Sequence, residues 1–232
     1  MQEIVPTGSS KRREMVDGYR HKGRREELVK LLRTKGITDE KVLSAIGTIP
    51  RHFFLDSAFD HIAYEDRAFP IAADQTISQP YTVAYQTQLL KIKPGQKVLE
   101  IGTGSMYQTA VLSAVGAKVY TIERQKQLFD LIPYFEHIKQ YKHIHFFFGD
   151  GFEGLPDVAP FDRILITAAA PKIPEKLWAQ LKVNGKMVIP LDKEDGIAQR
   201  MLRITKKKDG QEKRESFEEF SFVPMLEGKT SK

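Results

Sequence analysis

A glycine turn, followed at a distance by an acidic residue, is the part of this sequence best suited to hold a nucleotide. Gly102 and Gly104 come directly after the apolar run 98–101, and residues 107–115 then carry apolar side chains at helical spacing. Such a strand, turn and helix direct backbone N–H groups at a ligand. Glu123 ends the next apolar run, 19 residues after Gly104, where a carboxylate can accept both ribose hydroxyls. The pattern predicts a nucleotide site but leaves the kind of nucleotide open.

Two interpretations of this turn compete. A dinucleotide site requires the pattern G-x-G-x-x-G, and Tyr107 stands where its third glycine should be. Glu100-x-Gly102-x-Gly104 instead resembles the loop E/D-x-G-x-G-x-G of S-adenosylmethionine-dependent methyltransferases. That ligand has no pyrophosphate, and a carboxylate such as Glu100 near the turn suits its zwitterionic amino-acid end. We therefore favour S-adenosyl-L-methionine as the cofactor.

One position departs from the resembled loop, because Met106 stands where a third glycine is expected. The Met side chain either crowds the cofactor and changes the local backbone, or points into the packing between sheet and helix and fills a gap there. We expect cofactor binding to be retained, with its affinity open to change.

The elements that must position the turn alternate between strands and helices. Apolar patterns predict five strands and then a hairpin, at residues 98–101, 118–122, 143–148, 161–167, 186–191, 199–205 and 216–223. Helices are predicted before the first strand, at residues 24–35, 40–46 and 81–90, and between the later strands. This order predicts an α/β fold: a doubly wound, mostly parallel, Rossmann-like sheet with antiparallel C-terminal strands and an N-terminal helical cap.

Composition and charge narrow the class of protein. The chain has 232 residues, 41% of them hydrophobic, and no cysteine, which excludes disulfides, thiolate catalysis and cysteine-based zinc sites. No apolar run is long enough to span a membrane, so we expect a cytoplasmic protein. Residues 1–22 are polar and aperiodic and are predicted to be a flexible basic extension, with residues 23–232 forming a single domain. Oligomeric state leaves no mark on the sequence, and we expect a monomer.

The net charge of +6 is concentrated near the N-terminus. Residues 1–35 contain ten basic and five acidic side chains, so the rest of the chain is close to neutral. A basic end on a near-neutral body is more typical of a solvated tail or exposed helix than of a nucleic-acid arm. We therefore do not expect nucleic acid to be a partner.

A longer stretch upstream of the turn narrows the interpretation. Residues 74–84, Asp-Gln-Thr-Ile-Ser-Gln-Pro-Tyr-Thr-Val-Ala, closely resemble the signature of the protein-L-isoaspartate (D-aspartate) O-methyltransferase family. Other segments resemble the same family in the same order, at residues 46–56, 98–105, 107–108, 120–124, 160–174 and 222–224. The resemblance covers residues 23 to 226.

This resemblance implies a repair reaction on damaged proteins. Asn and Asp residues rearrange through a succinimide to an isoaspartyl linkage, which leaves a free α-carboxylate in a displaced position. Enzymes of the family transfer the methyl group of S-adenosylmethionine to that carboxylate, and the ester reverts to succinimide, part of which opens to normal aspartate. Isoaspartyl-containing proteins and peptides would then be the substrates.

The resemblance also implies roles for individual residues. Ser78 is similar to the family's active-site serine, whose hydroxyl can hydrogen-bond the accepting carboxylate or the cofactor. Gln75, Thr76 and Ile77 precede it and would line the cofactor site. Taken alone, a serine before Gln-Pro is as readily explained by a hydroxyl–backbone turn leading into a helix at Pro80.

Further positions are implied along the cofactor itself. Gly102, Gly104 and Ser105 would contact the methionine end, and Glu123 would contact the ribose. Arg124 would follow the adenosine edge. Asp150 lies in the turn that begins at Gly149 and would accept from the adenine amino group. Asp150 is equally well explained as a turn aspartate. His143 and His145 alternate along a predicted strand without a third ligand nearby, so we predict no metal site there.

Two other functions remain open at this stage. The same fold could methylate RNA or another substrate, which the basic N-terminus would favour. A cofactor-binding but inactive protein is the other alternative, which Met106 would favour.

Overall fold

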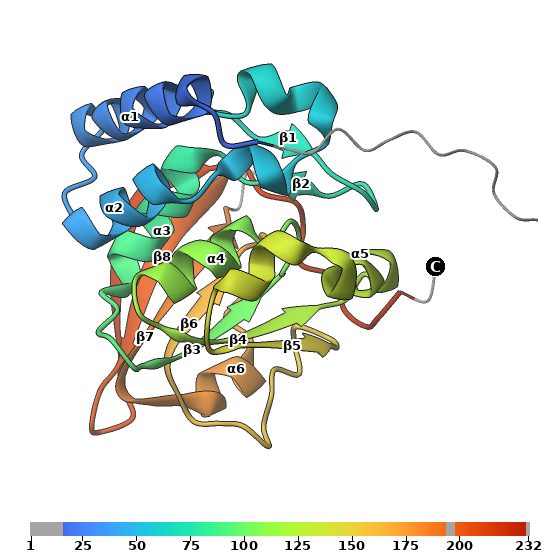
Figure 1. Cartoon of the computed structure of the whole chain (residues 1–232). Coiled ribbons are helices and arrows are strands. Elements are labelled where there is room, and N and C mark those ends of the chain that lie inside the picture. The colour runs from blue at the N-terminus through green and yellow to red at the C-terminus, as the bar shows by residue number, and fades with distance from the viewer. Residues whose placement is uncertain (1–15, 194–197, 231–232) are drawn as a thin grey trace, which may run out of the picture.

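Seven strands form the central sheet of the computed structural model, which describes residues 16–193 and 198–230 (Figure 1). The strands are β3 (Lys97–Ile101), β4 (Lys118–Glu123), β5 (Ile144–Phe148), β6 (Phe161–Ile166), β7 (Leu181–Asp192), β8 (Gln199–Lys206) and β9 (Glu212–Phe220). Their order in the sheet is β5-β4-β3-β6-β7-β8-β9. Neighbours from β5 to β7 are parallel, whereas β8 and β9 pair antiparallel. The predicted Rossmann-like sheet with antiparallel C-terminal strands is confirmed.

The chain changes direction across the sheet at its centre. From β3 it builds outward through β4 to β5, and then returns to the other side of β3 to form β6 and β7. Leu99 and Ile164, paired in the two central strands, are fully buried, as expected for strands that are covered on both faces. Ligands of open α/β sheets bind at the carboxyl ends of strands where the order reverses, which here is the edge between β3 and β6.

Helices cover both faces of the sheet. In Figure 1, α3 (Pro80–Leu90), α4 (Tyr107–Ala114) and α5 (Lys126–Leu131) lie above the sheet, and α6 (Glu175–Gln180) lies below it. Pro133 shortens α5, and the chain continues in two 3-10 helices, η3 (Ile132–Tyr134) and η4 (Glu136–Gln140). None of the helices in the described residues is both long and apolar enough to cross a membrane.

An N-terminal cap packs against α3 and α4. It consists of α1 (Tyr19–Thr34), α2 (Glu40–Thr48), two 3-10 helices, η1 (Arg51–Phe54) and η2 (Ser57–Ile62), and a ribbon of β1 (Phe69–Pro70) and β2 (Thr76–Ile77). Asp39 caps α2, because its carboxylate accepts the backbone N–H groups of Lys41 and Val42. The predicted helical cap is confirmed.

Three elements have boundaries that differ by more than two residues from the sequence prediction. Helix α1 begins at Tyr19 rather than Arg24, because the guanidinium of Arg25 binds both carboxylate oxygens of Asp17 at 2.8 Å and fixes the residues before the helix. Strand β7 begins at Leu181 rather than Lys186, and β9 spans Glu212–Phe220 rather than residues 216–223. The predicted extension therefore does not reach residue 22, and its first fifteen residues lie outside the described part of the chain.

Candidate functional site

A cavity of about 530 Å³ lies at the carboxyl ends of β3, β4 and β6, where the strand order reverses. Its volume is in the range of small-molecule and cofactor sites. Most of the residues predicted for the site line it together: Gln75, Thr76, Ile77, Ser78, Gly102, Gly104, Ser105, Glu123 and Arg124. Segments far apart in the sequence thus meet where the sequence pattern placed a nucleotide.

The glycine turn is held close to the end of β6. Gly102 has a φ of +97°, and a Cβ at this position would lie 2.5 Å from the Oγ1 atom of Thr167. The Thr167 hydroxyl donates to the carbonyls of Ile101 at 2.8 Å and Gly102 at 3.0 Å. Glycine is required at residue 102 both for its backbone conformation and for this close approach.

Glu123 projects from the end of β4 into the cavity wall. Its two carboxylate oxygens accept the backbone N–H groups of Gly104 and Gln125, each at 2.8 Å. Burial raises the pKa of Glu123, and the backbone donors oppose that rise. The Gly104 N–H donates to Glu123 and so orients that carboxylate; this N–H does not point freely at a ligand. The expected ribose acceptor is therefore fixed in position before a ligand binds.

Glu100 is not brought to the cavity, contrary to the prediction. Its side chain is fully buried, and its Oε2 atom accepts the hydroxyl of Thr109 in α4 at 2.6 Å. Alternation along β3 explains this, because Ile101 lines the cavity and the preceding residue must face the opposite side of the sheet. Burial raises the pKa of Glu100 to about 8.

Gly149 and Asp150 are also absent from the cavity wall. The two carboxylate oxygens of Asp150 accept the backbone N–H groups of Phe152 at 2.9 Å and Gly228 at 2.7 Å. Arg124 does line the cavity, but its guanidinium donates to the carbonyls of Gly228 at 3.1 Å and Glu227 at 3.3 Å. Both side chains thus bind residues 227–228 and hold the end of the chain beside the site.

The C-terminal segment is the part of the site that the sequence analysis did not assign. Residues 218–226 line the cavity opposite the glycine turn. Two bonds on either side of Pro224 tie this segment to the loop after β6, from the Ala169 N–H to the Val223 carbonyl at 2.8 Å and from the Met225 N–H to the Ala169 carbonyl at 2.7 Å. The only signal in the sequence was the resemblance of residues 222–224 to the end of the family pattern.

Met106 keeps the backbone conformation of a glycine. Its φ is +68° and its ψ is 0°, in the left-handed region, immediately before α4. The side chain is 5% exposed, packs with the core cluster of the N-terminal cap, and does not line the cavity. Of the two alternatives for this residue, the structure supports the one in which Met fills a gap in the packing.

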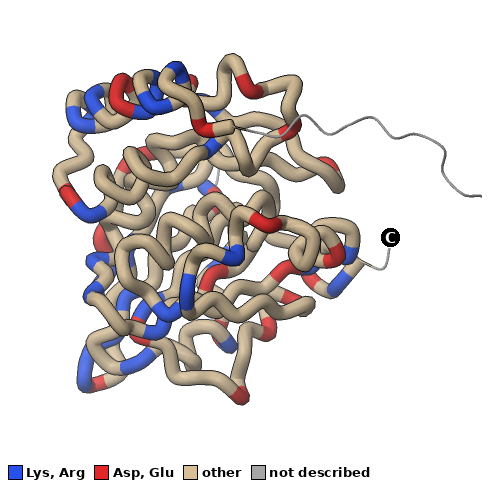
Figure 2. The backbone as a smooth tube through the Cα atoms, viewed as in Figure 1, with Lys and Arg blue, Asp and Glu red and all other residues tan. Residues whose placement is uncertain are grey.

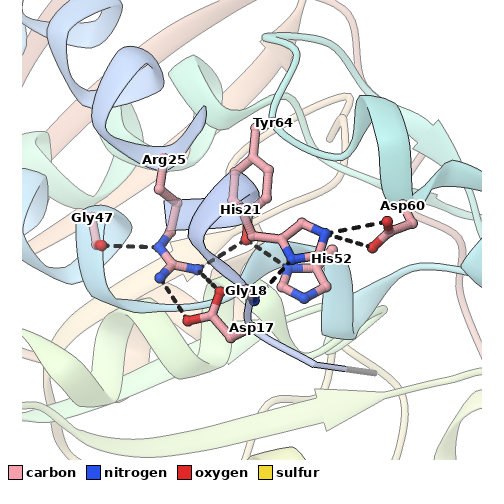
Figure 3. Close-up of polar contacts among 8 residues, drawn as sticks. All are labelled: Asp17, Gly18, His21, Arg25, Gly47, His52, Asp60 and Tyr64. Atoms are coloured by element: carbon pink, nitrogen blue, oxygen red, sulfur yellow. Dashed lines mark hydrogen bonds and ion pairs between the residues drawn. The ribbon is translucent and has the colours of Figure 1, made fainter. Parts of the chain in front are cut away.

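A second group of polar side chains lies away from the cavity, at the start of α1 (Figure 3). Potential ligand atoms of Asp17, His21 and His52 lie within 4.8 Å of one another. Both oxygens of Asp17 accept from Arg25, and His21 Nδ1 accepts the Gly18 N–H at 3.2 Å. Because these atoms of Asp17 and His21 already accept hydrogen bonds beside a guanidinium, the group fastens α1 to the rest of the cap rather than offering a cation site.

Comparison with known proteins agrees with this geometry. Residues 23–230 match the sequence profile of the protein-L-isoaspartate(D-aspartate) O-methyltransferase family. The chain belongs to this family. Protein-L-isoaspartate O-methyltransferases from Christiangramia forsetii and Flavobacterium johnsoniae are each 54% identical over 215 residues, which is 93% of this chain and 100% of theirs.

Solved structures of protein-L-isoaspartate O-methyltransferases share the fold. One is 28% identical with a TM-score of 0.77, covering 86% of this chain and 65% of that chain. Another, from Plasmodium falciparum, is 26% identical with a TM-score of 0.74, covering 89% and 98%, and was solved in complex with S-adenosyl-L-homocysteine. That ligand is S-adenosylmethionine without its transferable methyl group.

The residues of the cavity fit this cofactor. Glycine at residue 102 leaves room beside Thr167, where any side chain would collide. A buried carboxylate, Glu123, stands at the end of β4, where a ribose acceptor is expected. Ser78 lines the same cavity as the glycine turn.

Proposed function

We propose that this protein is an S-adenosylmethionine-dependent carboxyl O-methyltransferase that methylates the free α-carboxylate of L-isoaspartyl residues in damaged proteins. The observation that carries the proposal is that the stretch of residues 75–81, called the Ser78 segment below, lines one cavity together with the glycine turn. Membership of the family, over residues 23–230, supports the same activity.

The reaction needs little general acid–base catalysis from the protein. An isoaspartyl carboxylate has a reference pKa near 4 and is ionised at neutral pH, so it needs no general base. When bound, S-adenosylmethionine supplies a methyl group on a positively charged sulfur. The chain's residues must therefore hold the carboxylate in line with that methyl group and exclude water as the two charges neutralise.

Each half of the cavity has a separate task in this proposal. The glycine turn and Glu123 bind the cofactor, with the Glu123 carboxylate accepting from the ribose hydroxyls. The Ser78 hydroxyl, in the cavity wall above the turn, donates to the accepting carboxylate and orients it. Arg124 and Asp150 act indirectly, because they hold the C-terminal segment that forms the opposite wall.

The basic side chains of α1 give little support to an RNA substrate. Figure 2 shows both basic and acidic residues along this helix. Arg25 pairs with Asp17, and Arg33 near the end of α1 pairs with Glu40. Because these two guanidinium groups are paired within the protein, they contribute less positive charge toward a nucleic-acid backbone.

Labelled S-adenosylmethionine and two matched peptides test the proposed activity. One peptide contains an isoaspartyl residue, and its twin contains a normal aspartyl residue at the same position. We expect methylation of the isoaspartyl peptide alone. Equal methylation of the two peptides, or methylation of neither, would contradict the proposal.

The cytoplasmic location and the monomeric state remain predictions. The absence of cysteine supports the first, because the chain does not depend on an oxidising compartment for its stability. Sedimentation of the purified protein would test the second.

A further inference from the structure

Arg51, in η1, is a buried charge outside the cavity. Its side chain is fully buried, and no ion pair joins it to a carboxylate among the described residues. Burial lowers the pKa of Arg51 to about 10, so the guanidinium is still protonated at neutral pH. A buried charge without a direct counter-ion is costly, and its retention requires a structural explanation.

The guanidinium of Arg51 binds backbone carbonyls instead. Nε donates to Ala63 at 3.0 Å, and Nη2 donates to Ser78 at 2.9 Å and, more weakly, to Arg67 at 3.4 Å. The guanidinium carbon also lies 4.8 Å from the centre of the Tyr107 ring. Tyr107 is the first residue of α4, three residues after Gly104 of the glycine turn. Arg51 therefore contacts both the segment expected to bind the substrate and the helix that follows the cofactor turn.

Asp66 holds the same segment from its other end. One carboxylate oxygen accepts the backbone N–H of Tyr81 at 2.8 Å, and the other accepts Gln79 Nε2 at 3.1 Å. Lys35 pairs with Asp66 at 2.6 Å and keeps it in place. The Asp66 side chain is 6% exposed, so these bonds are largely shielded from water.

The Ser78 segment has few other constraints. The strand before Ser78, β2, has only two residues, and the following helix begins at Pro80, which has no N–H to donate. Two side chains from an earlier part of the chain thus supply bonds at Ser78 itself and at the residues that follow it.

We propose that Arg51 and Asp66 are positioning residues that fix the Ser78 segment relative to the glycine turn. Arg51 acts through the Ser78 carbonyl and the Tyr107 ring, and Asp66 acts through the backbone of Tyr81 and the side chain of Gln79. The proposal rests on the proposed methyltransferase function, because it assigns the acceptor carboxylate to Ser78. Transfer between two bound groups depends on alignment, so loosening this segment slows turnover more than it weakens cofactor binding.

The variant Arg51→Lys tests the proposal while keeping the charge. A single ammonium group cannot reproduce the planar, multidentate bonding of a guanidinium to several carbonyls. We expect kcat for the isoaspartyl peptide to fall by about tenfold to 100-fold, as for a small misplacement of reacting groups. The dissociation constant of S-adenosylmethionine, measured by calorimetry, should change by less than about threefold, because the turn and Glu123 are intact.

Arg25→Lys is the matched control. Arg25 is another buried arginine of the cap, 4% exposed, that binds Asp17, the Gly47 carbonyl and the Tyr64 hydroxyl (Figure 3). None of those three partners lines the cavity. Both variants should lose stability, so kcat is compared at a temperature at which circular dichroism shows both to be folded. We expect kcat of Arg25→Lys to stay within about twofold of the wild type.

Hydrogen exchange of residues 76–83, followed by mass spectrometry, gives a readout that does not depend on activity. Exchange in this peptide should be faster in Arg51→Lys than in Arg25→Lys. If Arg51→Lys does not fold, Asp66→Asn replaces it, since the amide retains one oxygen acceptor but not the second. That variant should show the same lower kcat and faster exchange.

The outcomes separate this proposal from the proposed function. A wild-type protein that binds the cofactor but does not methylate the isoaspartyl peptide contradicts the function, and exchange of residues 76–83 then decides the positioning role. Equal kcat values for Arg51→Lys and Arg25→Lys, in a wild-type protein that is active, overturn the positioning role. So does unchanged exchange in residues 76–83.

Discussion

Met106 combines an unfavourable backbone conformation with a well-buried side chain, and the two contributions can be separated by substitution. A left-handed conformation costs a residue with a Cβ atom about 1–2 kcal/mol, and this cost applies to Met106 at a φ of +68°. Its side chain is only 5% exposed, and truncation of a buried Met to Ala costs about 2–5 kcal/mol. The packing contribution is thus the larger of the two.

The alanine variant should therefore be less stable than the glycine variant at residue 106, whereas alanine is normally the more stabilising of the two in a helix. Met106→Ala keeps the strain and loses the packing, so its free energy of unfolding should fall by about 2–5 kcal/mol. Met106→Gly loses the same packing but relieves about 1–2 kcal/mol of strain. The greater conformational freedom of glycine in the unfolded chain lowers stability by about 0.4–1 kcal/mol and so offsets part of that relief. We expect Met106→Gly to be less stable than the wild type but more stable than Met106→Ala, by about 1 kcal/mol at the middle of these ranges.

Urea unfolding of the wild type and both variants measures these differences. The control is Glu27, an exposed residue in the middle of α1, where Ala should exceed Gly by about 1 kcal/mol. Cofactor affinity should change by less than about threefold in Met106→Gly, because the side chain is not in the cavity wall. An alanine variant at residue 106 as stable as the glycine variant would refute the assignment of strain there.

Three further predictions concern the carboxylates and Ser78. Burial raises the pKa of Glu100 to about 8, so the folded protein binds a proton that the unfolded chain has released, and stability falls as the pH rises from about 4.5 to about 8. In that interval the free energy of unfolding of Glu100→Gln, measured with urea, should rise relative to that of the wild type by about 1.4 kcal/mol per pH unit. Glu123→Gln should weaken S-adenosylmethionine binding by about tenfold or more in calorimetry, because a charged acceptor is lost. Ser78→Ala should lower kcat for the isoaspartyl peptide more than it lowers cofactor affinity, measured by steady-state assay and calorimetry.

Each of these has a distinct contrary result. A constant stability difference between Glu100→Gln and the wild type across this pH range would mean that Glu100 is ionised when buried. Unchanged affinity in Glu123→Gln would remove Glu123 from the ribose site. A large loss of cofactor affinity with normal turnover in Ser78→Ala would place Ser78 in the cofactor site rather than beside the substrate.

The sequence predicted the parts of the fold that depend on local patterns. The strands next to the glycine turn and the helix beginning at Pro80 follow from apolar spacing and from the restricted backbone of proline. The cavity residues on both sides of that helix were predicted by motif, because short contiguous segments supply them.

The parts that were missed depend on contacts between distant residues. Asp150 lies outside the cavity wall because its carboxylate accepts the backbone N–H of Gly228. Arg124 does line the cavity, but its bonds to the carbonyls of Glu227 and Gly228 are not recorded in the sequence pattern. The start of α1 is set by the pairing of Arg25 with Asp17. For Glu100 the spacing was correct, but the direction of its side chain follows from the pleat of β3, which the loop pattern does not record.

The far wall of the cavity has a consequence for the timing of activity during synthesis. The glycine turn is complete by residue 105, but residues 218–226 close the opposite side of the cavity. A nascent chain on the ribosome can therefore form the cofactor turn once its partners Glu123 and Thr167 have emerged, but still before it can enclose a substrate. The enzyme should gain its repair activity only after Leu226 has left the exit tunnel, and it cannot act on other proteins while most of its own chain is still being made.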